Sequence, residues 1–305
     1  MLEFEATYEA IASGVVGRVR SADVVKVAGP DARSYLQGQV TQDLDGLAAG
    51  QGAETLLLSP QGKLELAARV LVGGPEELFV EVEAGYGQAA LERLARFKLR
   101  VKATLELLSW RLVELRGPHA TPPPADAQGD GAPSFLLPYR FGPLAGYDLL
   151  GPEASLPAGV EEGDDGAFDV ARIEAGVPRM GTELTERTIP QEAGIVSRTV
   201  SFTKGCYTGQ ELVARIDSRG NRVPVRLCGV VLDVDAPPST PGDLLLNADR
   251  EVGTLTSVGY SPRLRRQVAL AYLKREVQPP AELELVAAGT RHRAEAVPLP
   301  LDAGA

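Results

Sequence analysis

The stretch Lys204-Gly-Cys-Tyr-Thr-Gly-Gln-Glu211 is the most informative part of this sequence. Thr208 is followed three residues later by Glu211, the spacing of a capping box at a helix N-terminus. Apolar residues then recur at helical spacing, which predicts a helix that begins near Gly209 and buries Leu212, Val213 and Ile216.

Cys206 lies two residues before the predicted cap. Free backbone N–H groups and the positive end of the helix dipole favour an anion there, and Lys204 can add a positive charge. Gly205 and Gly209 permit a close approach to the thiol. These features predict a reactive thiolate at Cys206. The alternative, a small buried residue in a tight turn, stays open from the sequence.

The same eight residues resemble the signature of the YgfZ-type folate-binding proteins, which are relatives of the glycine-cleavage T-protein, an aminomethyltransferase. The match to Lys-Gly-Cys-aromatic-x-Gly-Gln-Glu is complete. Two further blocks resemble that family, so that the resemblance covers nearly the whole chain: residues 25–44 (VKVAGPDARSYLQGQVTQDL) and residues 172–184 (RIEAGVPRMGTEL), the latter followed by IPQE at 189–192.

The resemblance implies an α+β fold, a T-protein-like ring of subdomains with mixed or antiparallel sheets around a folate channel and a small C-terminal β-barrel. It also implies tetrahydrofolate or a derivative as cofactor, and a role with iron–sulfur client or assembly proteins. Cys206 is then the key residue, with Lys204 beside it. The other motif residues carried over are Gly205, Tyr207, Gly209, Gln210 and Glu211.

Folate-pocket residues follow from the resemblance alone. Gly146-Tyr-Asp148 resembles the T-protein segment whose glutamate bonds the pterin, so Asp148 is expected to accept from the pterin N–H groups. Arg172 and Glu174 are two of the other candidates, and the alternative to a role in the pocket is that they form an exposed pair on a helix. The complete set of further candidates is Arg172, Glu174, Glu65, Gln39 and Asp43.

Two departures from the T-protein argue against ordinary aminomethyl transfer. The T-protein carries an Asp-Asp pair where this chain has Glu65 and Leu66, and successive strand residues point to opposite faces. An arginine that precedes the T-protein's Arg-x-Glu-Ala-Gly helix is replaced by Phe168.

Outward from the motif, the pattern divides the chain into three parts. Residues 1–118 form the N-terminal folate-binding α+β part, residues 119–222 a second α+β part that carries the motif, and residues 223–305 the barrel. Proline and glycine in residues 118–133 predict a loop at the first boundary. Helices are expected at 31–39, 86–97 and 169–175, and strands at 24–27, 55–58, 63–72, 78–82, 101–108, 111–115, 223–234, 243–246, 251–260, 268–273, 282–286 and 292–297.

A dinucleotide motif competes with this interpretation. Gly85-Tyr-Gly-Gln-Ala-Ala90 resembles the Gly-x-Gly-x-x-Ala turn of a nicotinamide-dependent oxidoreductase. The residues that follow, 98–104, alternate polar and apolar side chains, which does not suit a strand buried on both faces of a parallel sheet. The oxidoreductase is therefore the weakest candidate.

Composition excludes several classes of protein. The chain has 305 residues and a net charge of −10, and an acidic surface disfavours nucleic acid as a partner. Its two cysteines cannot fill a four-thiolate cluster shell, and its two histidines exclude a histidine-rich metal site, so no resident metal is expected. An acidic N-terminus and the lack of a long apolar run predict a cytoplasmic protein without a membrane span.

Three function classes remain from the sequence: a folate-binding factor for iron–sulfur proteins, an aminomethyltransferase of glycine cleavage, and the oxidoreductase. The sequence leaves open whether the first is an enzyme, possessing transferase-like chemistry, or a scaffold. It also leaves open the client proteins, the folate species, the oligomeric state, and whether Cys206 ligates iron, transfers sulfur or exchanges disulfides.

Overall fold

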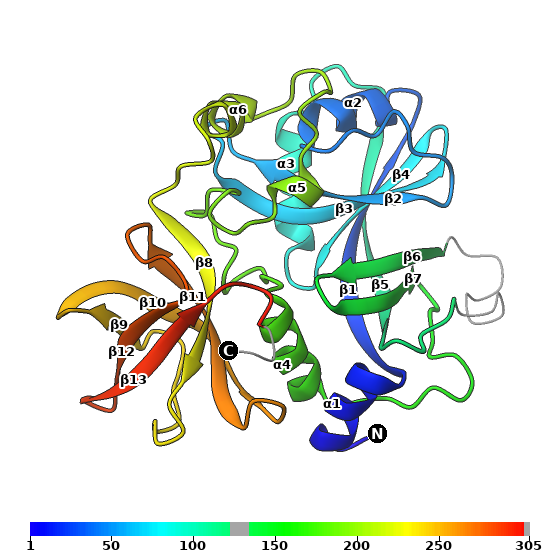
Figure 1. Ribbon diagram of the computed structural model, residues 1–305. Helices are drawn as coiled ribbons and strands as arrows, with labels where there is room; N and C mark the ends of the chain where they lie inside the picture. The colour runs from blue at the N-terminus through cyan, green and yellow to red at the C-terminus, as the bar shows by residue number, and fades with distance from the viewer. Residues whose placement is uncertain (123–133, 302–305) are drawn as a thin grey trace.

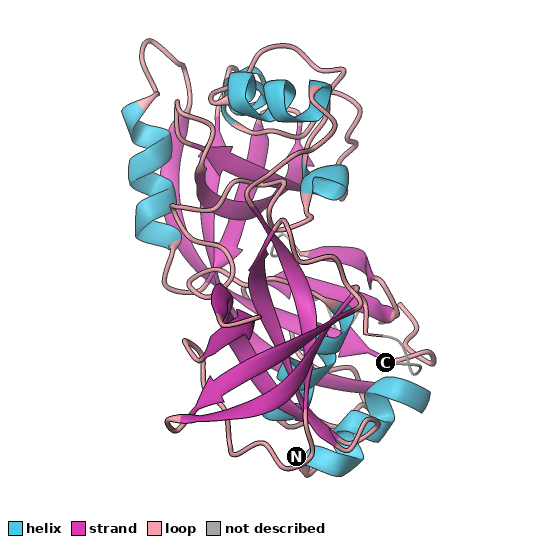
Figure 2. Cartoon of the chain, turned by 60° about the vertical axis from the view of Figure 1, so that its left-hand side comes forward, coloured by secondary structure: helices cyan, strands magenta, loops and turns pink. Residues whose placement is uncertain are grey.

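The computed structural model describes residues 1–122 and 134–301, which form an antiparallel sheet with helices around it and a separate closed barrel (Figure 1). Most of the loop expected at 118–133 lies outside the described residues. In the view of Figure 2, strands make up the centre of both parts, and helices flank them at the top, the left and the lower right. The predicted α+β class is confirmed.

The sheet has seven strands in the order β2-β3-β4-β1-β5-β7-β6, and all its neighbours pair antiparallel. The long strand β1 pairs with β5 over its whole length and with β4 only over its second half, so it belongs to both halves of the sheet. The strands are β1 (Val16–Ala28), β2 (Gly52–Leu58), β3 (Leu64–Gly74), β4 (Glu77–Glu83), β5 (Thr104–Arg116), β6 (Phe135–Phe141) and β7 (Leu144–Gly151).

Two sequence expectations change within this sheet. The strands expected at 101–108 and 111–115 are one continuous strand, β5, and the sequence interpretation did not find β6 and β7. The boundary proposed at residue 118 falls in the connection between β5 and β6, inside a single sheet. The three-part division of the chain stays a prediction.

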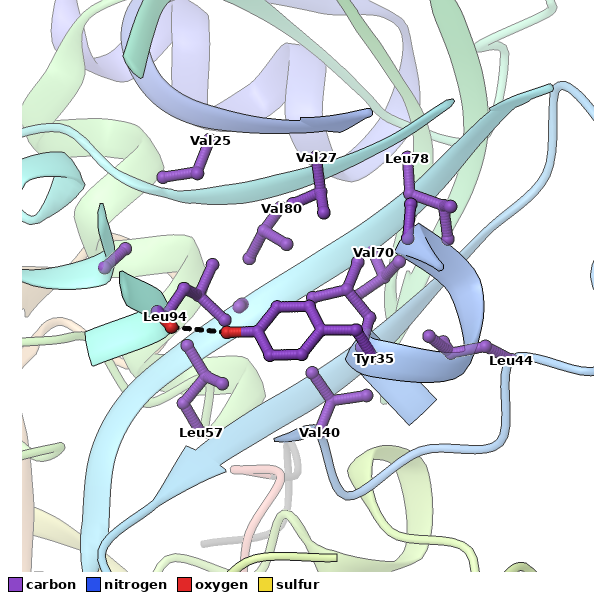
Figure 3. Packing of buried hydrophobic residues seen from close by; sticks show 14 of the residues in the cluster. Val25, Val27, Tyr35, Val40, Leu44, Leu57, Val70, Leu78, Val80 and Leu94 are labelled. Atoms are coloured by element: carbon purple, nitrogen blue, oxygen red, sulfur yellow. Dashed lines mark hydrogen bonds between the residues drawn. The ribbon is translucent and has the colours of Figure 1, made fainter. Parts of the chain in front are cut away.

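One face of the sheet is covered by α2 (Ala32–Gln39) and α3 (Gly87–Arg96). Tyr35 lies at the centre of the apolar cluster between them, and its hydroxyl donates to the carbonyl oxygen of Leu94 (Figure 3). Because a buried hydroxyl needs a partner, this hydrogen bond ties α2 to α3. The cluster includes Val25, Val27, Val70, Leu78 and Val80.

The turn at Gly85 and Gly87 binds a side chain of the protein itself. Both backbone N–H groups donate to Asp23 Oδ2 at 2.8 Å. The flanking strands β4 and β5 both pair antiparallel with β1, which lies between them. A dinucleotide fold needs parallel neighbours at this place, so the oxidoreductase interpretation fails.

The C-terminal region forms a closed barrel of strand order β10-β11-β8-β13-β12-β9, as the sequence predicts. Helix α1 (Phe4–Ser13), which the sequence interpretation missed, packs on α4 (Asp165–Ala175), and α4 also contacts β10 of the barrel. None of the helices in the described part of the chain has the length and apolar character of a membrane span. The barrel strands are β8 (Val225–Leu232), β9 (Leu244–Asn247), β10 (Arg250–Ser261), β11 (Arg266–Lys274), β12 (Ala281–Ala287) and β13 (Thr290–Val297).

Candidate functional site

The cysteine motif forms a loop that leads into α6 (Gln210–Ser218). The helix begins where the sequence predicts, but the capping box does not form. Gly209 is the N-cap residue, with φ of 82°, and makes no side-chain cap hydrogen bond. The backbone N–H of Thr208 donates instead to the carbonyl oxygen of Gly38. A glycine in the left-handed region therefore starts the helix in place of the threonine.

Lys204 points into the protein. Its ammonium group donates to the carbonyl oxygens of Gln37 (2.7 Å), Val40 (2.8 Å) and Gln42 (2.7 Å) at the C-terminal end of α2. Burial lowers its pKa to about 8, although the carboxylates of Asp43 and Asp45 oppose that shift. All three donors are used, so Lys204 holds the motif loop onto α2 through these bonds.

Cys206 itself is exposed, and the interpretation of a buried turn residue is therefore wrong. Phe202 is also exposed, at 46%, whereas Tyr207 packs into the core at 7%. Cys228 is buried in β8, and burial raises the pKa of its thiol to about 11. Of the two thiols, only Cys206 is accessible to a partner.

A cavity of about 220 Å³ lies between the sheet, residues 177–184 and the short helix α5 (Val196–Thr199); we call it the central cavity. Its walls alternate acids and arginines with a few apolar and aromatic side chains. Cys206 is not among its lining residues. Those that carry the argument are Glu54, Arg69, Glu114, Tyr139, Asp148 and Arg198.

Asp148 is the one predicted folate residue that lines the central cavity. Its Oδ2 accepts from Arg69 Nη1 at 2.5 Å. Its Oδ1 lies 2.8 Å from Arg116 Nη1 but has no aligned hydrogen bond. The guanidinium of Arg116 also stacks on Tyr139, 3.7 Å from the ring centre. Two arginines therefore hold the Asp148 carboxylate in the wall of the central cavity, and its Oδ1 is buried beside Arg116.

Glu114 stands beside this carboxylate on the same sheet. Burial alone would raise its pKa, but the guanidinium groups of Arg18 and Arg116 lower it to about 2. Arg18 Nε lies 2.5 Å from Glu114 Oε2. The carboxylate is therefore ionised at neutral pH and compensates the buried arginines.

Gln39 and Glu65 meet outside the central cavity, where both accept hydrogen bonds from Arg93 of α3. The pairing of β2 with β3 shifts between Leu57 and Leu58, which makes Glu65 the extra residue of a bulge. Leu66 packs with the α2–α3 cluster, on the side where Glu65 meets Arg93. The expectation that residues 65 and 66 point to opposite faces is wrong at this bulge.

The remaining candidates also have structural partners. Arg172 is buried and binds Asp169, Glu183 and Ser257, which links α4 to the barrel, so it is not an exposed helix residue. Asp43 accepts from Gln37 and from the Asp45 N–H, and these bonds lower its pKa. Glu174 accepts from the hydroxyl of Tyr8 at 2.9 Å and lines a second, larger cavity.

Several residues of the central cavity were not predicted from the sequence. Arg20, Arg69, Arg179 and Arg198 supply its positive charge, and Tyr139 and Phe141 its aromatic surface. One signal was present, because Glu114 and Arg116 alternate with buried apolar residues on β5 and so share a face. No local sequence signal predicts that Arg198, which follows Arg116 by 82 positions, lies at the same face.

The comparisons with known proteins agree with this architecture. The glycine cleavage T-protein C-terminal barrel domain matches residues 225–302. The crystal structure of aminomethyltransferase T from Bartonella henselae has the same fold, with a TM-score of 0.79 and 20% identity, over 98% of this chain and 89% of that one.

Three relatives are similar in sequence. An aminomethyltransferase of Thermus thermophilus is 30% identical over 85% of this chain and 79% of its own length. The tRNA-modifying protein YgfZ of Edwardsiella ictaluri is 32% identical over 64% of this chain and 65% of its own. The mitochondrial iron–sulfur cluster assembly factor IBA57 homolog of Neurospora crassa is 28% identical over 74% of this chain and 56% of its own. The chain therefore belongs to the aminomethyltransferase family of the glycine-cleavage T-protein, as a YgfZ-type member.

Proposed function

We propose that this protein is a tetrahydrofolate-binding factor that acts through Cys206 in the assembly or repair of iron–sulfur clusters. The observation that supports the proposal best is the exposure of Cys206 close in sequence to the central cavity. Arg198 and Thr199 line the central cavity, and Cys206 follows Thr199 by seven residues. The name of the N. crassa relative, an iron–sulfur cluster assembly factor, supports the same role.

The residues of the central cavity fit the pterin head of a folate. Asp148 places a carboxylate in the wall of the cavity, the kind of acceptor that suits the amino and ring N–H groups of a pterin. Tyr139, Phe141 and Met180 offer flat or soft apolar surface to a ring. When bound, tetrahydrofolate carries one-carbon units on a nitrogen of its reduced ring and on the neighbouring aminobenzoyl nitrogen. The protein's part would be to hold the ring at Asp148 and to limit water around it.

Two features favour this role over aminomethyl transfer. The carboxylate pair of the T-protein is reduced to Glu65, and Arg93 binds Glu65 on the helix-covered side of the sheet. Phe168, at the place of the T-protein's arginine, lies buried beneath the guanidinium of Arg18 at 4.6 Å. Neither residue offers a free charge to a substrate in the central cavity.

Cys206 would act together with a client protein. Among the residues that the structure describes, no group of three or more His, Cys, Asp or Glu side chains is placed to hold a metal ion. A single exposed thiol is a soft ligand that can complete a shell supplied mainly by another chain. We therefore place the cluster, or its iron and sulfur, on the client as substrate.

The test is complementation in cells that lack this protein, read out as the activity of a radical or dehydratase iron–sulfur enzyme. Cys206→Ala and Cys206→Ser are expected to fail, whereas Cys228→Ala, at the buried thiol, restores activity. Equal rescue by Cys206→Ala would overturn the role of the thiol.

The competing function has its own assay. Purified protein is incubated with aminomethyl-lipoyl carrier and tetrahydrofolate, and methylene-tetrahydrofolate is measured. We expect turnover at background level. Robust turnover would assign the chain to glycine cleavage in place of the proposed role.

A further inference from the structure

A basic segment joins α3 to β5. Residues 96–102 read Arg-Phe-Lys-Leu-Arg-Val-Lys, with four cations and no acid, in a chain whose net charge is −10. None of the four cationic side chains forms an ion pair or a hydrogen bond with another residue that the structure describes. Leu99, in the middle of the segment, is 82% exposed. We call residues 96–102 the basic loop.

The fold accounts for only part of this composition. Arg96 lies in the last turn of α3, where a cation suits the helix dipole. Arg100 and Lys102 lie beyond the helix, and Arg100 has a φ of 58°, a conformation that glycine adopts more easily. Lys98 and Arg100 flank the exposed Leu99. An apolar side chain with charges around it resembles the apolar centre and polar rim of a protein–protein interface.

The basic loop and the cysteine loop are attached to opposite ends of α2. The N–H of Lys102 donates to Asp31, the N-cap residue of α2, at 2.7 Å. At the other end, the carbonyl oxygen of Gly38 accepts from Thr208 of the cysteine loop. An eight-residue helix is about 12 Å long, so the two attachment points lie about that far apart. α2 and α6 both lie at the top of the molecule in Figure 1. A protein interface of ordinary size, ~800 Å² on each partner, covers such a distance.

A second set of contacts fixes the start of the basic loop. The ring of Phe97 stacks on the guanidinium of Arg93, 4.2 Å from it. Arg93 is buried and donates to Gln39 and to the carbonyl oxygen of Leu58, each at 3.0 Å. The loop is thereby held at both of its ends, and a surface that is ordered beforehand loses less entropy when a partner binds.

Charge and apolar exposure together indicate the chemistry of the partner. Four unpaired cations attract an acidic surface, and complementary charge speeds the encounter of two proteins. Leu99, and Phe202 in the cysteine loop at 46% exposure, need an apolar counterpart, which a protein offers and a phosphate backbone does not. With the basic loop set aside, the rest of the chain is more acidic still and repels a long polyanion. These features favour an acidic protein over RNA.

We propose that the basic loop is a docking site for an acidic surface of the iron–sulfur client protein, which buries Leu99 and meets Cys206 in the same contact. The inference rests on the proposed function. It adds the place on this chain where the client binds and the sign of the charge that the client presents there.

Complementation at two expression levels tests the inference, with the activity of aconitase, a dehydratase iron–sulfur enzyme, as the readout. Lys98→Glu with Arg100→Glu should lower the rescued activity about fivefold at low expression. At about tenfold higher expression the activity should return to the wild-type value, because mass action offsets weaker docking. Leu99→Ser should behave in the same way. Cys206→Ala should fail at both levels, since a higher concentration does not replace a thiol.

Arg265→Glu with Arg266→Glu is the matched control. It changes the net charge by the same amount at two exposed arginines between β10 and β11 of the barrel, and it should rescue like the wild type at both levels. Full rescue at low expression by the Lys98 and Arg100 variant would overturn the inference, as would an equal loss in the control. Both results leave the proposed function intact, because that depends on the Cys206 variant.

Fluorescence anisotropy with purified protein separates a protein partner from RNA. Labelled apo-aconitase should bind the Lys98 and Arg100 variant about tenfold more weakly than the wild type at low salt, and the difference should shrink at high salt. Labelled transfer RNA should bind both proteins equally weakly. A loss of affinity for transfer RNA alone would assign the basic loop to nucleic acid and overturn the inference, and so would failure of apo-aconitase to bind the wild type.

Discussion

Gly62 and Gly209 lie back to back, where the turn between β2 and β3 meets the start of α6: a Cβ built on Gly209 would stand 3.1 Å from the Cα of Gly62 and 2.5 Å from the carbonyl oxygen of Ser59. Both glycines have positive φ, 78° and 82°. The start of α6, at the end of the cysteine loop, is therefore held against the β2–β3 turn by a backbone contact that leaves no room for a side chain.

Gly209→Ala should destabilise the protein by about 2–4 kcal/mol, because alanine is strained at this φ and its methyl group would meet backbone atoms. Urea unfolding measures the change. Gly205→Ala, in the same motif, is the control: no atom lies within 4 Å of its Cβ position and its φ is not positive, so its effect should stay within about 0.5 kcal/mol. Equal effects of the two variants would contradict the role of the contact.

Lys204→Met should cost about 2–4 kcal/mol, since it leaves the carbonyl oxygens of Gln37, Val40 and Gln42 without their buried donor. Thermal unfolding gives the comparison with Lys63→Met, which removes an exposed lysine from the neighbouring turn and should be close to neutral. If Lys204→Met were as stable as the Lys63 variant, the lysine would not anchor the loop.

Stability should fall in acid through Glu114. Its pKa is about 2 in the folded protein against 4.5 ordinarily, so its contribution is complete above pH 4.5 and is lost as the pH falls from 4.5 towards 2. That loss amounts to up to about 3 kcal/mol in the free energy of unfolding.

Urea titrations at pH 7, 5, 4 and 3 measure this dependence. Glu114→Gln should be less stable at pH 7, because Arg18 and Arg116 lose their counter-charge, and should show a shallower decline. Glu186→Gln, at an exposed carboxylate that pairs with no described residue, should retain the wild-type slope. An unchanged slope in Glu114→Gln would show that other groups carry the acid sensitivity.

Alkylation should distinguish the two thiols. In native protein at pH 8, iodoacetamide should modify Cys206 alone, because Cys228 is buried and its pKa is about 11. Mass spectrometry of peptides reads out each site, and labelling in urea, where both react, is the reference. A Cys206 that reacts no faster than the buried Cys228 would contradict its assigned accessibility.

Local patterns predicted the regular parts of the fold. The six strands of the barrel, the helices over residues 31–39 and 86–97, and the start of α6 near Gly209 follow from alternation, apolar spacing and turn residues. Local patterns failed where a contact between residues far apart in the sequence intervened. The capping box at Thr208 is replaced by a hydrogen bond from its N–H to Gly38. The bulge at Glu65 places this side chain on the same side of the sheet as Leu66, whereas simple alternation predicts opposite sides.

The family, the barrel and the position of the motif cysteine can be predicted from the sequence, because they depend on residues that are neighbours in the chain. Three relationships become visible only in the folded chain: Lys204 anchors the loop on α2, Glu65 binds Arg93, and Asp148, Arg198 and Tyr139 line one cavity. Charges far apart in sequence pair according to which strands are adjacent and which face each residue takes, and no local pattern encodes that.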